Sequence, residues 1–492
     1  MSLHLPSQLF VGGEFRAPAH GGTEVVLNPA TEEPIGEAPL GTRADAEAAV
    51  AAARESFDRG AWRRLAPRDR AEAMRRVYEH LAAREDEIVE LITAEAGALA
   101  GMARAAQFGA PMKHFRYFLE AAARPMTTMA PPELTLSKQG DRMLGTAIVE
   151  REPVGVVTAI TAFNYPMMLN VMKVVPALLM GNSVILKPSP YTPFVALLLA
   201  EAVQAAGLPE GVFNVVTGGK DAGELLTADP RVDMVTFTGS DEVGAAIAAQ
   251  AAPTLKRVVM ELGGKSALIV RDDADLESAV AVGSSAILSH SGQACVALSR
   301  QLVHRSLLDR YLEGLVRRVE GVRIGDPRDP QSQMGPLIRA AQRERVESFV
   351  AGGLKSGGRL VTGGRRPEDL PRGYYFQPTV FADVDNSWPL AQQEIFGPVV
   401  AVMGFDSDEE AIRIANDSPY GLNAHVFSAD VGAALDVARE LQSGNVSLNG
   451  GSGAMLSAAP FGGVKRSGYG REAGVEGLLE FTAAKTISFH AA

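Results

Sequence analysis

Between residues 154 and 270 the chain alternates between short apolar runs and longer stretches with helical spacing, and this alternation restricts the fold more than any other feature. The apolar runs occupy residues 154–160, 183–186, 212–216, 234–237 and 258–260. The stretches between them, each long enough for a crossover helix, are 167–180, 194–206, 221–228 and 241–251. Strands that are apolar on both faces, with helices between them, indicate a parallel sheet covered on both sides. We therefore predict a doubly wound α/β domain whose ligand lies at the carboxyl ends of the strands.

The flanking segments predict further α/β structure. A chain of 492 residues exceeds a single hydrophobic core, which stops growing near roughly 250 to 300 residues, so two or three domains are expected. Alanine-rich amphipathic helices are predicted over residues 44–57 and 67–96. A second α/β unit follows residue 270, with strands at 300–304 and 399–405 and helices at 275–289, 307–320, 339–351, 408–416 and 430–442. A polar, proline-containing excursion is predicted over residues 124–145, and a loop-rich region rich in glycine and proline over 352–378.

Composition and charge exclude several classes of partner. The formal net charge is −11, which argues against nucleic acid, because a surface that binds phosphates must be basic. Residues 154–172 carry no charge, but Asn164, Pro166 and Asn170 interrupt them, so we interpret this stretch as a strand, a turn and a helix and expect no membrane contact. The N-terminus has no basic segment followed by an apolar one, and a single cysteine suits a reducing compartment, so a cytoplasmic location is expected.

Cys295 is the only cysteine of the chain. A lone thiol makes neither an intramolecular disulfide nor a multi-cysteine zinc site, so it is either a packed apolar side chain or a nucleophile. His290 lies five residues earlier, and a packed or solvated histidine explains it better than a base does, because a base is identified by its position in space. The eight histidines form no metal-ligand pattern, so no metal site is predicted.

Polar residues follow four of the five predicted strands. The four segments are Phe163-Asn164-Tyr165-Pro166, Lys187-Pro188-Ser189-Pro190, Thr238-Gly239-Ser240 and Glu261-Leu262-Gly263-Gly264. Gly239 and Gly244 frame a Gly-x-x-x-x-Gly turn that opens a helix, and a helix start offers N–H groups to a phosphate, although a tight turn explains the pattern equally well. The sequence Gly264-Lys265-Ser266 matches the end of a phosphate-binding P-loop, but Val259 stands where that loop needs its first glycine, so the P-loop is excluded.

Seven segments, in the same order and covering nearly the whole chain, resemble the aldehyde dehydrogenase superfamily of NAD(P)-dependent enzymes that oxidise aldehydes to carboxylic acids. They are Phe163-Asn164-Tyr165-Pro166, Lys187-Pro188-Ser189, Phe237-Thr238-Gly239-Ser240, Glu261-Leu262-Gly263-Gly264-Lys265, Gly292-Gln293-Ala294-Cys295, Glu394-Ile395-Phe396-Gly397-Pro398, and Pro460-Phe461-Gly462-Gly463-Val464-Lys465 with Ser467-Gly468. Each segment alone is a weak signal. Together they identify Cys295 as the expected nucleophile.

The resemblance implies a covalent mechanism to which these residue types are suited. Cys295 as thiolate attacks the aldehyde carbon, and Asn164 with the backbone N–H of Cys295 stabilises the oxyanion of the thiohemiacetal. Hydride transfer leaves a thioester, and Glu261 is the general base that activates water for hydrolysis to the free acid. Lys173 and Glu472 match positions that shuttle protons, although a structural ion pair explains them equally well. Family members that transfer the acyl group to coenzyme A generally lack the glutamate, which disfavours that activity here.

The resemblance also implies an NAD site, with NADP as an alternative. Lys187 is expected at the adenosine ribose, Ser240 at the pyrophosphate, and Glu394 at the nicotinamide ribose with Phe396 beside the ring. Many NAD-preferring members carry a glutamate three residues after the lysine, and it repels a 2′-phosphate. Here that residue is Pro190, so this discrimination against NADP is missing. The expected cofactor-binding residues are Ile160, Thr161, Phe163, Lys187, Ser189, Pro190, Gly223, Phe237, Thr238, Gly239, Ser240, Val243, Leu262, Gly263, Gln342 with Arg345, Glu394 and Phe396.

The substrate-binding positions implied by the resemblance are mostly apolar. They are Tyr165, Met168, Met172, Ala294, Val296, Met455 and Phe461. None of these positions carries a lysine or arginine, so a neutral apolar or aromatic aldehyde is favoured as substrate. An acidic or amino semialdehyde dehydrogenase is retained as an alternative, as are a cofactor-independent cysteine hydrolase and a catalytically idle binding protein on the same fold.

The predicted fold class is α/β, with a doubly wound cofactor domain, a second α/β catalytic domain and a small β oligomerisation arm. Residues 1–123 and 150–262 are assigned to the dinucleotide-binding domain, 263–470 to the catalytic domain, and 124–149 with 471–492 to the arm. Residues 124–150 resemble the protruding β-hairpin that, with the C-terminal strand near 485–489, bridges subunits in the family. A homodimer or homotetramer is therefore expected.

Overall fold

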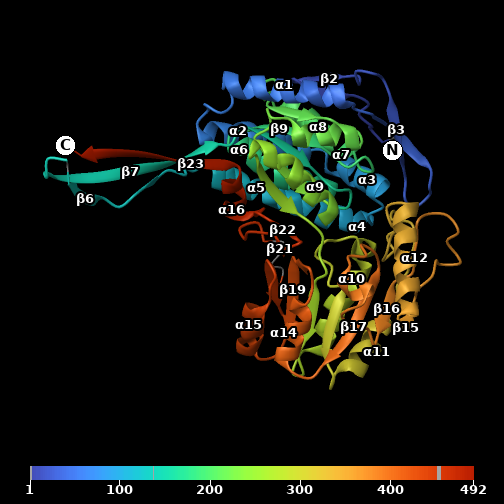
Figure 1. Cartoon of the computed structure of the whole chain (residues 1–492). Helices are drawn as coiled ribbons and strands as arrows, with labels where there is room; N and C mark the ends of the chain where they lie inside the picture. The colour runs from blue at the N-terminus through green and yellow to red at the C-terminus, as the bar shows by residue number, and fades with distance from the viewer. Residues whose placement is uncertain (1–2, 137, 452–455, 492) are drawn as a thin grey trace.

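The computed structural model describes residues 3–136, 138–451 and 456–491. Figure 1 shows two lobes, each built around a sheet, and an arm that projects from the first lobe. The sheet of the first lobe contains, in spatial order, β2 (Glu14–Arg16), β1 (Leu9–Val11), β10 (Phe213–Val215), β9 (Ser183–Lys187), β8 (Val156–Ile160), β11 (Met234–Thr238), β12 (Arg257–Glu261) and β22 (Gly468–Tyr469). The five strands from β10 to β12 are mutually parallel. Because β8 comes first in the sequence and lies in the middle, the chain winds outward in both directions, which confirms the predicted doubly wound arrangement.

Helices cover both faces of this sheet, which explains why its strands are apolar on both sides. Along β8, Val156 packs in a cluster with three helices, α1 (Arg43–Arg59), α8 (Lys220–Ala228) and α9 (Asp241–Ala251). Val157 and Ala159 point to the opposite face and pack with α2 (Pro67–Ala82), α3 (Glu85–Ala96), α5 (Ala110–Ala122), α6 (Pro166–Leu179) and α7 (Phe194–Ala205). The uncharged stretch 154–172 thus contains all of β8, a turn and the first half of α6. In the part of the chain that the structure describes, no helix has the length and apolar character needed to cross a membrane.

The sheet of the second lobe is also mostly parallel. Its strands, in spatial order, are β15 (Arg359–Thr362), β16 (Thr379–Ala382), β17 (Val399–Phe405), β14 (Arg300–His304), β13 (Ala267–Val270), β19 (Asn423–Phe427) and β20 (Asn445–Leu448). Only the pair β15 and β16 at one edge is antiparallel. Two helices, α10 (Leu276–Leu288) and α11 (Leu308–Glu320), pack on one face, and α12 (Ala340–Lys355), α13 (Pro389–Gln392), α14 (Asp408–Asn416) and α15 (Val431–Glu440) pack on the other. The predicted second α/β unit is present.

The arm is a small antiparallel sheet that extends away from the first lobe (Figure 1). Its long strand β7 (Arg142–Pro153) pairs on one side with β23 (Thr482–Ala491) and on the other with β5 (Thr128–Met129) and β6 (Glu133–Leu136). The predicted excursion after residue 124 is confirmed, and the C-terminal strand pairs with the arm of its own chain. The remaining short elements are β3 (Thr23–Leu27) with β4 (Pro34–Pro39), β18 (Tyr420–Gly421) with β21 (Val464–Lys465), α4 (Ala100–Met102), the π-helix Ala103–Gly109, the 3₁₀ turns Ala252–Thr254 and Ser289–Gly292, and α16 (Gly474–Glu480).

Three local predictions were wrong or incomplete. Residues 67–96 form two helices, because the backbone leaves helical geometry at Arg84, whose φ and ψ are −112° and 22°. The guanidinium of Arg84 bonds Glu87 and Glu201, and three acidic residues occupy the first turn of α3, where the helix dipole favours them. Residues 352–378 are not entirely loop, since α12 continues to Lys355 and β15 forms an edge strand. The helix α5 and the strands β1–β4, β13, β16, β19 and β20 were not predicted.

Gly155 at the start of β8 is required by a close contact. Its φ is +136°, and a Cβ atom there would lie 1.8 Å from Oδ2 of Asp233. That same oxygen accepts hydrogen bonds from the backbone N–H of Val156 and from Arg54, so it has little freedom to move away. We predict that Gly155→Ala lowers the free energy of unfolding by the backbone penalty of a positive φ and, in addition, by about 1–3 kcal/mol for the clash with Asp233. Urea denaturation measures this difference.

Gly207 provides the matched control. Its φ is +72°, but nothing lies within 4 Å of the position of a Cβ atom, so Gly207→Ala is expected to cost only the backbone penalty of about 1–2 kcal/mol. Equal losses of stability in the two variants would contradict the contact with Asp233.

Candidate active site

A cavity of about 900 Å³ lies between the two lobes. It is bordered by the segments that follow the carboxyl ends of β8, β11 and β12, where a doubly wound sheet binds its ligand. From the second lobe, the residues around Cys295 and the segment around Glu394 complete its wall. The volume suits an extended organic ligand of several hundred daltons.

Cys295 is held in this cavity by unusual backbone geometry. It follows the turn Ser289–Gly292, in which His290 and Ser291 have φ values of 47° and 55°. Gly264 lies so close that a Cβ atom there would be 2.5 Å from the carbonyl oxygen of Cys295, and this glycine therefore allows the loop after Glu261 to contact the cysteine segment. Cys295 is partly exposed and lines the cavity. The sequence prediction that these two segments form one site agrees with this placement.

Burial disfavours the ionised form of the thiol. It raises the pKa of Cys295 to about 12, and the negative charges of Glu394 and Glu261 add to the rise. The backbone N–H groups of Cys295 and Val296 act in the opposite direction. A positive charge brought into the cavity would therefore favour the thiolate.

Asn164 lies beside the cysteine segment. Its Nδ2 donates to the backbone carbonyl oxygen of Gln293 at 3.0 Å, and the backbone carbonyl oxygen of Asn164 accepts from Gln107 Nε2 at 3.2 Å. A side-chain amide carries two N–H groups, so one is left for a second acceptor in the cavity. Both Asn164 and Cys295 line the cavity, as an oxyanion site requires.

Glu261 occupies the end of β12 and is buried behind the cavity wall. Neither carboxylate oxygen has a hydrogen-bond partner among the described residues. Burial raises the pKa of this carboxyl well above its usual range; the charge of Glu472 adds to the rise, while Lys173 and Arg471 oppose it. The negative charge of Glu261 adds to the raised pKa of the Cys295 thiol. An unpaired carboxyl with a raised pKa is suited to proton exchange.

Lys173 and Glu472 form a buried ion pair beside Glu261. Lys173 Nζ lies 2.5 Å from Glu472 Oε1 and also donates to Thr236 Oγ1 at 3.2 Å. The side chain of Lys173 is fully buried, and Glu472 reaches the cavity surface. This arrangement agrees with the structural ion pair and leaves the proton-shuttle interpretation open.

The predicted cofactor-binding residues divide into two groups. Those that line the cavity are Phe163, Thr238, Gly239, Ser240, Leu262, Gly263, Gln342, Glu394 and Phe396. Those outside its wall are Ile160, Thr161, Lys187, Ser189, Pro190, Gly223, Phe237 and Val243. The strand register places Ile160 beside both Lys187 and Phe237, so these three residues lie together at the carboxyl edge of the sheet. The hydroxyl of Thr161 is turned into the core, where it donates to Asn170.

Two of these positions have the character of a nucleotide site. Burial lowers the pKa of Lys187 to about 8, and its side chain passes Gly223, where a Cβ atom would lie 3.4 Å from Lys187 Cε. Ser240 caps α9 by accepting from the N–H of Val243 at 3.3 Å. Gly244, which the sequence suggested as part of the opening turn, instead lies inside α9 and packs against Leu262.

Side chains of α12 donate hydrogen bonds to the backbone of the segment that contains Glu394 and Phe396. Gln342 donates to the carbonyl oxygens of Ile395 and Phe396, and Arg345 donates to that of Glu394. Glu394 in turn accepts from the N–H of Gly264 at 3.0 Å, and burial raises the pKa of its carboxyl to about 7. Gln342 and Arg345 line the cavity, but their observed hydrogen bonds go to the backbone of the segment that contains Glu394 and Phe396.

The predicted substrate positions are brought together, with one exception. Tyr165, Met168, Met172, Ala294, Val296 and Phe461 all line the cavity, whereas Met455 lies outside the described residues. Sequence reasoning missed twelve other residues on the wall, namely Ala106, His114, Ala162, Leu169, Asp241, Glu242, Ser289, Gln392, Gln393, Pro419, Tyr420 and Arg466. His114 belongs to α5, whose apolar residues Met112, Phe115 and Leu119 recur at helical spacing, so this helix had a detectable signal.

His290 is a packed histidine, as the sequence favoured. It is buried, its ring stacks edge to face with Tyr165 at 5.6 Å, and burial lowers its pKa to about 4. Within the described part of the chain, no group of three or more His, Cys, Asp or Glu side chains is arranged to hold a metal ion.

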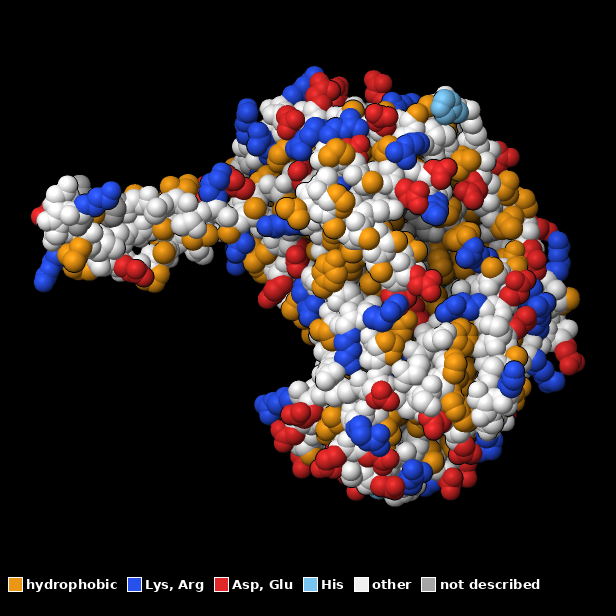
Figure 2. All heavy atoms as spheres, in the orientation of Figure 1, with side chains coloured by type: hydrophobic (Ala, Val, Ile, Leu, Met, Phe, Trp, Pro, Cys, Tyr) orange, Lys and Arg blue, Asp and Glu red, His pale blue; other side chains and the backbone are white. Residues whose placement is uncertain are grey.

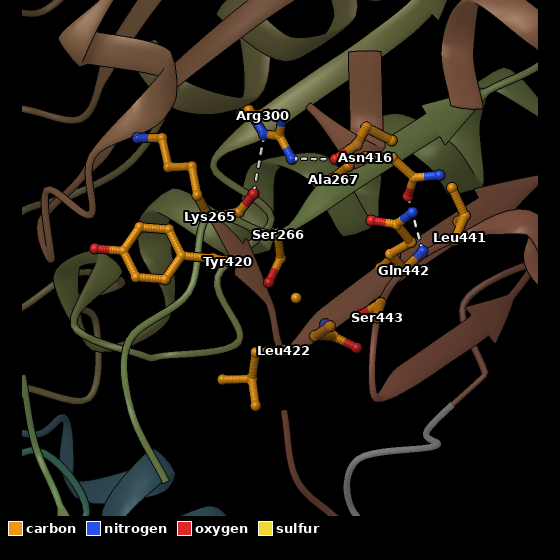
Figure 3. A pocket seen from close by; sticks show the side chains of 14 residues that line it. Lys265, Ser266, Ala267, Arg300, Asn416, Tyr420, Leu422, Leu441, Gln442 and Ser443 are labelled. Carbon is orange, nitrogen blue, oxygen red and sulfur yellow. Dashed lines mark hydrogen bonds between the residues drawn. The ribbon is translucent and has the colours of Figure 1, made fainter. Parts of the chain in front are cut away.

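A second cavity lies in the second lobe beside Lys265 and Arg300 (Figure 3). Arg300 donates to the carbonyl oxygens of Lys265, Ile414 and Ala415, which fixes this wall. The volume of about 20 Å³ holds about one water molecule, so this cavity is not a substrate site.

The buried ion pair generates a stability prediction. Lys173→Met leaves the carboxylate of Glu472 without its partner, so we expect a loss of about 3–5 kcal/mol in the free energy of unfolding, measured by urea denaturation. The double variant Lys173→Met with Glu472→Leu removes both charges and is expected to recover most of that loss. A double variant no more stable than the single one would contradict a direct pairing.

Comparison with known proteins gives a consistent assignment. A family model described as "Aldehyde dehydrogenase family" matches residues 15–487. A 3-succinoylsemialdehyde-pyridine dehydrogenase from Pseudomonas sp. is 41% identical over 98% of each chain. A betaine aldehyde dehydrogenase variant from Staphylococcus aureus, solved in complex with NAD+, has a TM-score of 0.94 at 36% identity and covers 99% of this chain and 98% of its own. A variant of aldehyde dehydrogenase C from Pseudomonas syringae, solved with NAD+ and octanal, has a TM-score of 0.92 at 38% identity over 99% and 98% of the two chains. The chain therefore belongs to the aldehyde dehydrogenase family.

Proposed function

We propose that this aldehyde dehydrogenase converts an aldehyde to the free carboxylic acid through a thiohemiacetal and a thioester on Cys295. The observation that carries the proposal is the position of this one thiol, partly exposed in a large cavity between two lobes. Asn164 shares the cavity wall, and the buried carboxyl of Glu261 interacts with the thiol.

The first step forms a bond between Cys295 Sγ and the aldehyde carbon, and the carbonyl oxygen becomes an oxyanion. The free N–H of the Asn164 amide and the backbone N–H of Cys295 donate to this oxygen. The amide donor is prepositioned, because the hydrogen bond from Asn164 to the carbonyl oxygen of Gln293 fixes it beside the cysteine segment. The oxyanion then favours loss of hydride from the same carbon, which leaves the thioester.

The residues present fit NAD(P)+. The Thr238 hydroxyl at the end of β11 is buried without a partner among the described residues, and Gly239 and Gly263 line the same cavity at positions where a Cβ atom would clash with Phe237 and Glu394. Lys187 would hold the adenosine ribose, Ser240 with the start of α9 the pyrophosphate, and Glu394 with Phe396 the nicotinamide nucleoside. When bound, the cofactor supplies the hydride acceptor and a positive charge that favours the Cys295 thiolate. Pro190 offers no carboxylate to repel a 2′-phosphate, so NAD is proposed with NADP as an alternative.

Glu261 is proposed as the base that activates water against the thioester. Both of its carboxylate oxygens lack partners in the described structure, so either is able to accept a proton from water without breaking a hydrogen bond. Gly462 approaches Oε1 so closely that a Cβ atom there would lie 2.8 Å away. The charges of Lys173 and Glu472 both act on the pKa of Glu261, and this pair is proposed to tune the base or relay its proton.

A neutral apolar or aromatic aldehyde is proposed as the substrate. The side chains of Tyr165, Met168, Met172 and Phe461 give the wall near Cys295 an apolar character. An acidic or amino semialdehyde is the alternative. Relatives named for a pyridine-linked semialdehyde and for betaine aldehyde have similar sequence identity to this chain. A cofactor-independent hydrolase is not favoured, because it leaves the segments around Ser240 and Glu394 without a role.

We also propose that the arm joins two copies of the chain. Its exposed side chains include the large apolar residues Met129, Leu134, Leu136, Leu144, Ile487 and Phe489, and Figure 2 shows hydrophobic side chains along it. Exposed apolar groups collected on one thin sheet favour burial against a partner. A homodimer or homotetramer follows, and a reducing compartment such as the cytoplasm suits a nucleophilic lone cysteine.

The proposed reaction predicts the behaviour of a panel of aliphatic, aromatic, amino- and carboxy-aldehydes assayed with NAD and with NADP. The parent enzyme is expected to reduce cofactor with the neutral members, and Cys295→Ala to lose this activity while still binding cofactor in a fluorescence titration. Absorbance of the reduced nicotinamide measures turnover. Turnover that survives in Cys295→Ala would overturn the covalent mechanism, and ester cleavage without cofactor reduction would favour the hydrolase.

The raised pKa of Glu261 predicts a dependence on pH. Below that pKa the carboxyl holds its proton and is unable to accept one from water, so thioester hydrolysis should slow as pH falls through the raised value. Pre-steady-state kinetics separates this step from the reduction of cofactor. In Glu261→Gln the acid limb of the hydrolysis profile should be absent, and an unchanged limb in that variant would assign it to another group.

A further inference from the structure

His114 is an unpartnered polar side chain in the wall near the proposed substrate positions. It lies on α5, which packs against α6, the helix that carries Met168 and Met172. Its residue surface is only 2% exposed, and its side chain lines the cavity. Nδ1 is buried without a hydrogen-bond partner among the described residues.

The surroundings of the ring keep it neutral. Burial lowers the pKa of His114, and the ring lies against Phe118 at 6.5 Å between centroids. A neutral imidazole carries one proton, and a buried N–H without an acceptor is costlier than a buried lone pair. The proton is therefore favoured on Nε2, because Nδ1 has no acceptor in reach.

Several charged groups on the cavity wall are already engaged. Glu472 is paired with Lys173. The lining arginines are also occupied, since Arg345 donates to the carbonyl of Glu394 and Arg466 pairs with Asp241. Among the cavity-lining residues of α5 and α6, His114 is the polar side chain, and it is therefore placed to meet a substrate remote from its aldehyde carbon.

We propose that His114 Nε2 donates a hydrogen bond to the substrate and selects aldehydes with an apolar body and one neutral acceptor, such as a ring nitrogen or a ketone oxygen. This inference rests on the proposed function, since it assigns a specificity role within the same cavity. A carboxylate at that end would meet no free cation on the described wall, because Arg345 and Arg466 are engaged. The N–H of a neutral imidazole offers no acceptor to an ammonium group.

The test compares matched substrates that differ only in the acceptor. Pyridine-3- and pyridine-4-carboxaldehyde are compared with benzaldehyde, and keto-aldehydes of increasing chain length with the alkanals of equal length. In the parent enzyme, kcat/KM for the best acceptor-bearing aldehyde is expected to exceed that of its apolar partner by about three- to tenfold, the range of one hydrogen bond. A ratio of one throughout the panel would overturn the role of His114.

Two variants locate the effect. His114→Phe keeps an aromatic ring and removes the donor, so the preference should vanish while the apolar aldehydes are still oxidised. His114→Gln places an amide N–H near the position of Nε2 and should restore part of the preference. A preference that persists in His114→Phe would also overturn the proposal. Failure of the parent enzyme to oxidise any member of the panel with either cofactor would instead refute the proposed function, so the two failures are distinguishable.

Discussion

Desolvation of several acids at one cavity is the constraint on which this site depends. Glu261 is buried behind the cavity wall, Cys295 and Glu394 are partly exposed on it, and burial is the largest cause of the raised pKa of each. Their charges also oppose one another, so a cavity in which all three are ionised is costly. A cationic ligand relieves this cost. The mutual repulsion of these acids therefore favours a positively charged cofactor, and the charge of that cofactor favours the thiolate of Cys295. The raised pKa of Glu261 keeps its carboxyl able to exchange a proton.

The two sheets provide the rigidity that this arrangement requires. Glu261 ends β12 and Asn164 follows β8, strands of one parallel sheet, whereas Cys295 approaches from the second lobe just before β14. Contact across the lobes depends on Gly264, whose missing side chain lets the carbonyl of Cys295 approach. The Lys173–Glu472 pair lies beneath Glu261 and ties α6 to the segment after β22. The strand ends and the contacts across the lobes thus restrict the backbone conformation that positions each reacting group.

Much of this could be predicted from sequence, because the strands of a doubly covered sheet are apolar on both faces. The bounds of β14 and β17 match the predicted strands, and Cys295, Asn164 and Glu394 were found from local segments. The helix that carries His114 was missed. It follows a π-helical stretch, Ala103–Gly109, in which the wider turn disrupts the regular apolar spacing.

Other features depend on contacts that no local pattern contains. The break at Arg84 involves an ion pair with Glu201, which is distant in the sequence. The unpaired oxygens of Glu261 and Nδ1 of His114 are properties of the packed cavity. The spacing of Gly244 predicted a loop glycine, but this residue lies in α9 and packs against Leu262. A tight turn and a close helix contact both require a residue without a side chain, so the spacing alone does not distinguish them.

The most direct test of the covalent account is the mass of the Glu261→Gln protein after a single turnover with an aldehyde and NAD+. Without the base the thioester should persist, so the intact mass should rise by one acyl group, and peptide mapping should place that group on Cys295. An unmodified cysteine after stoichiometric cofactor reduction, or an acyl group on another residue, would contradict the mechanism.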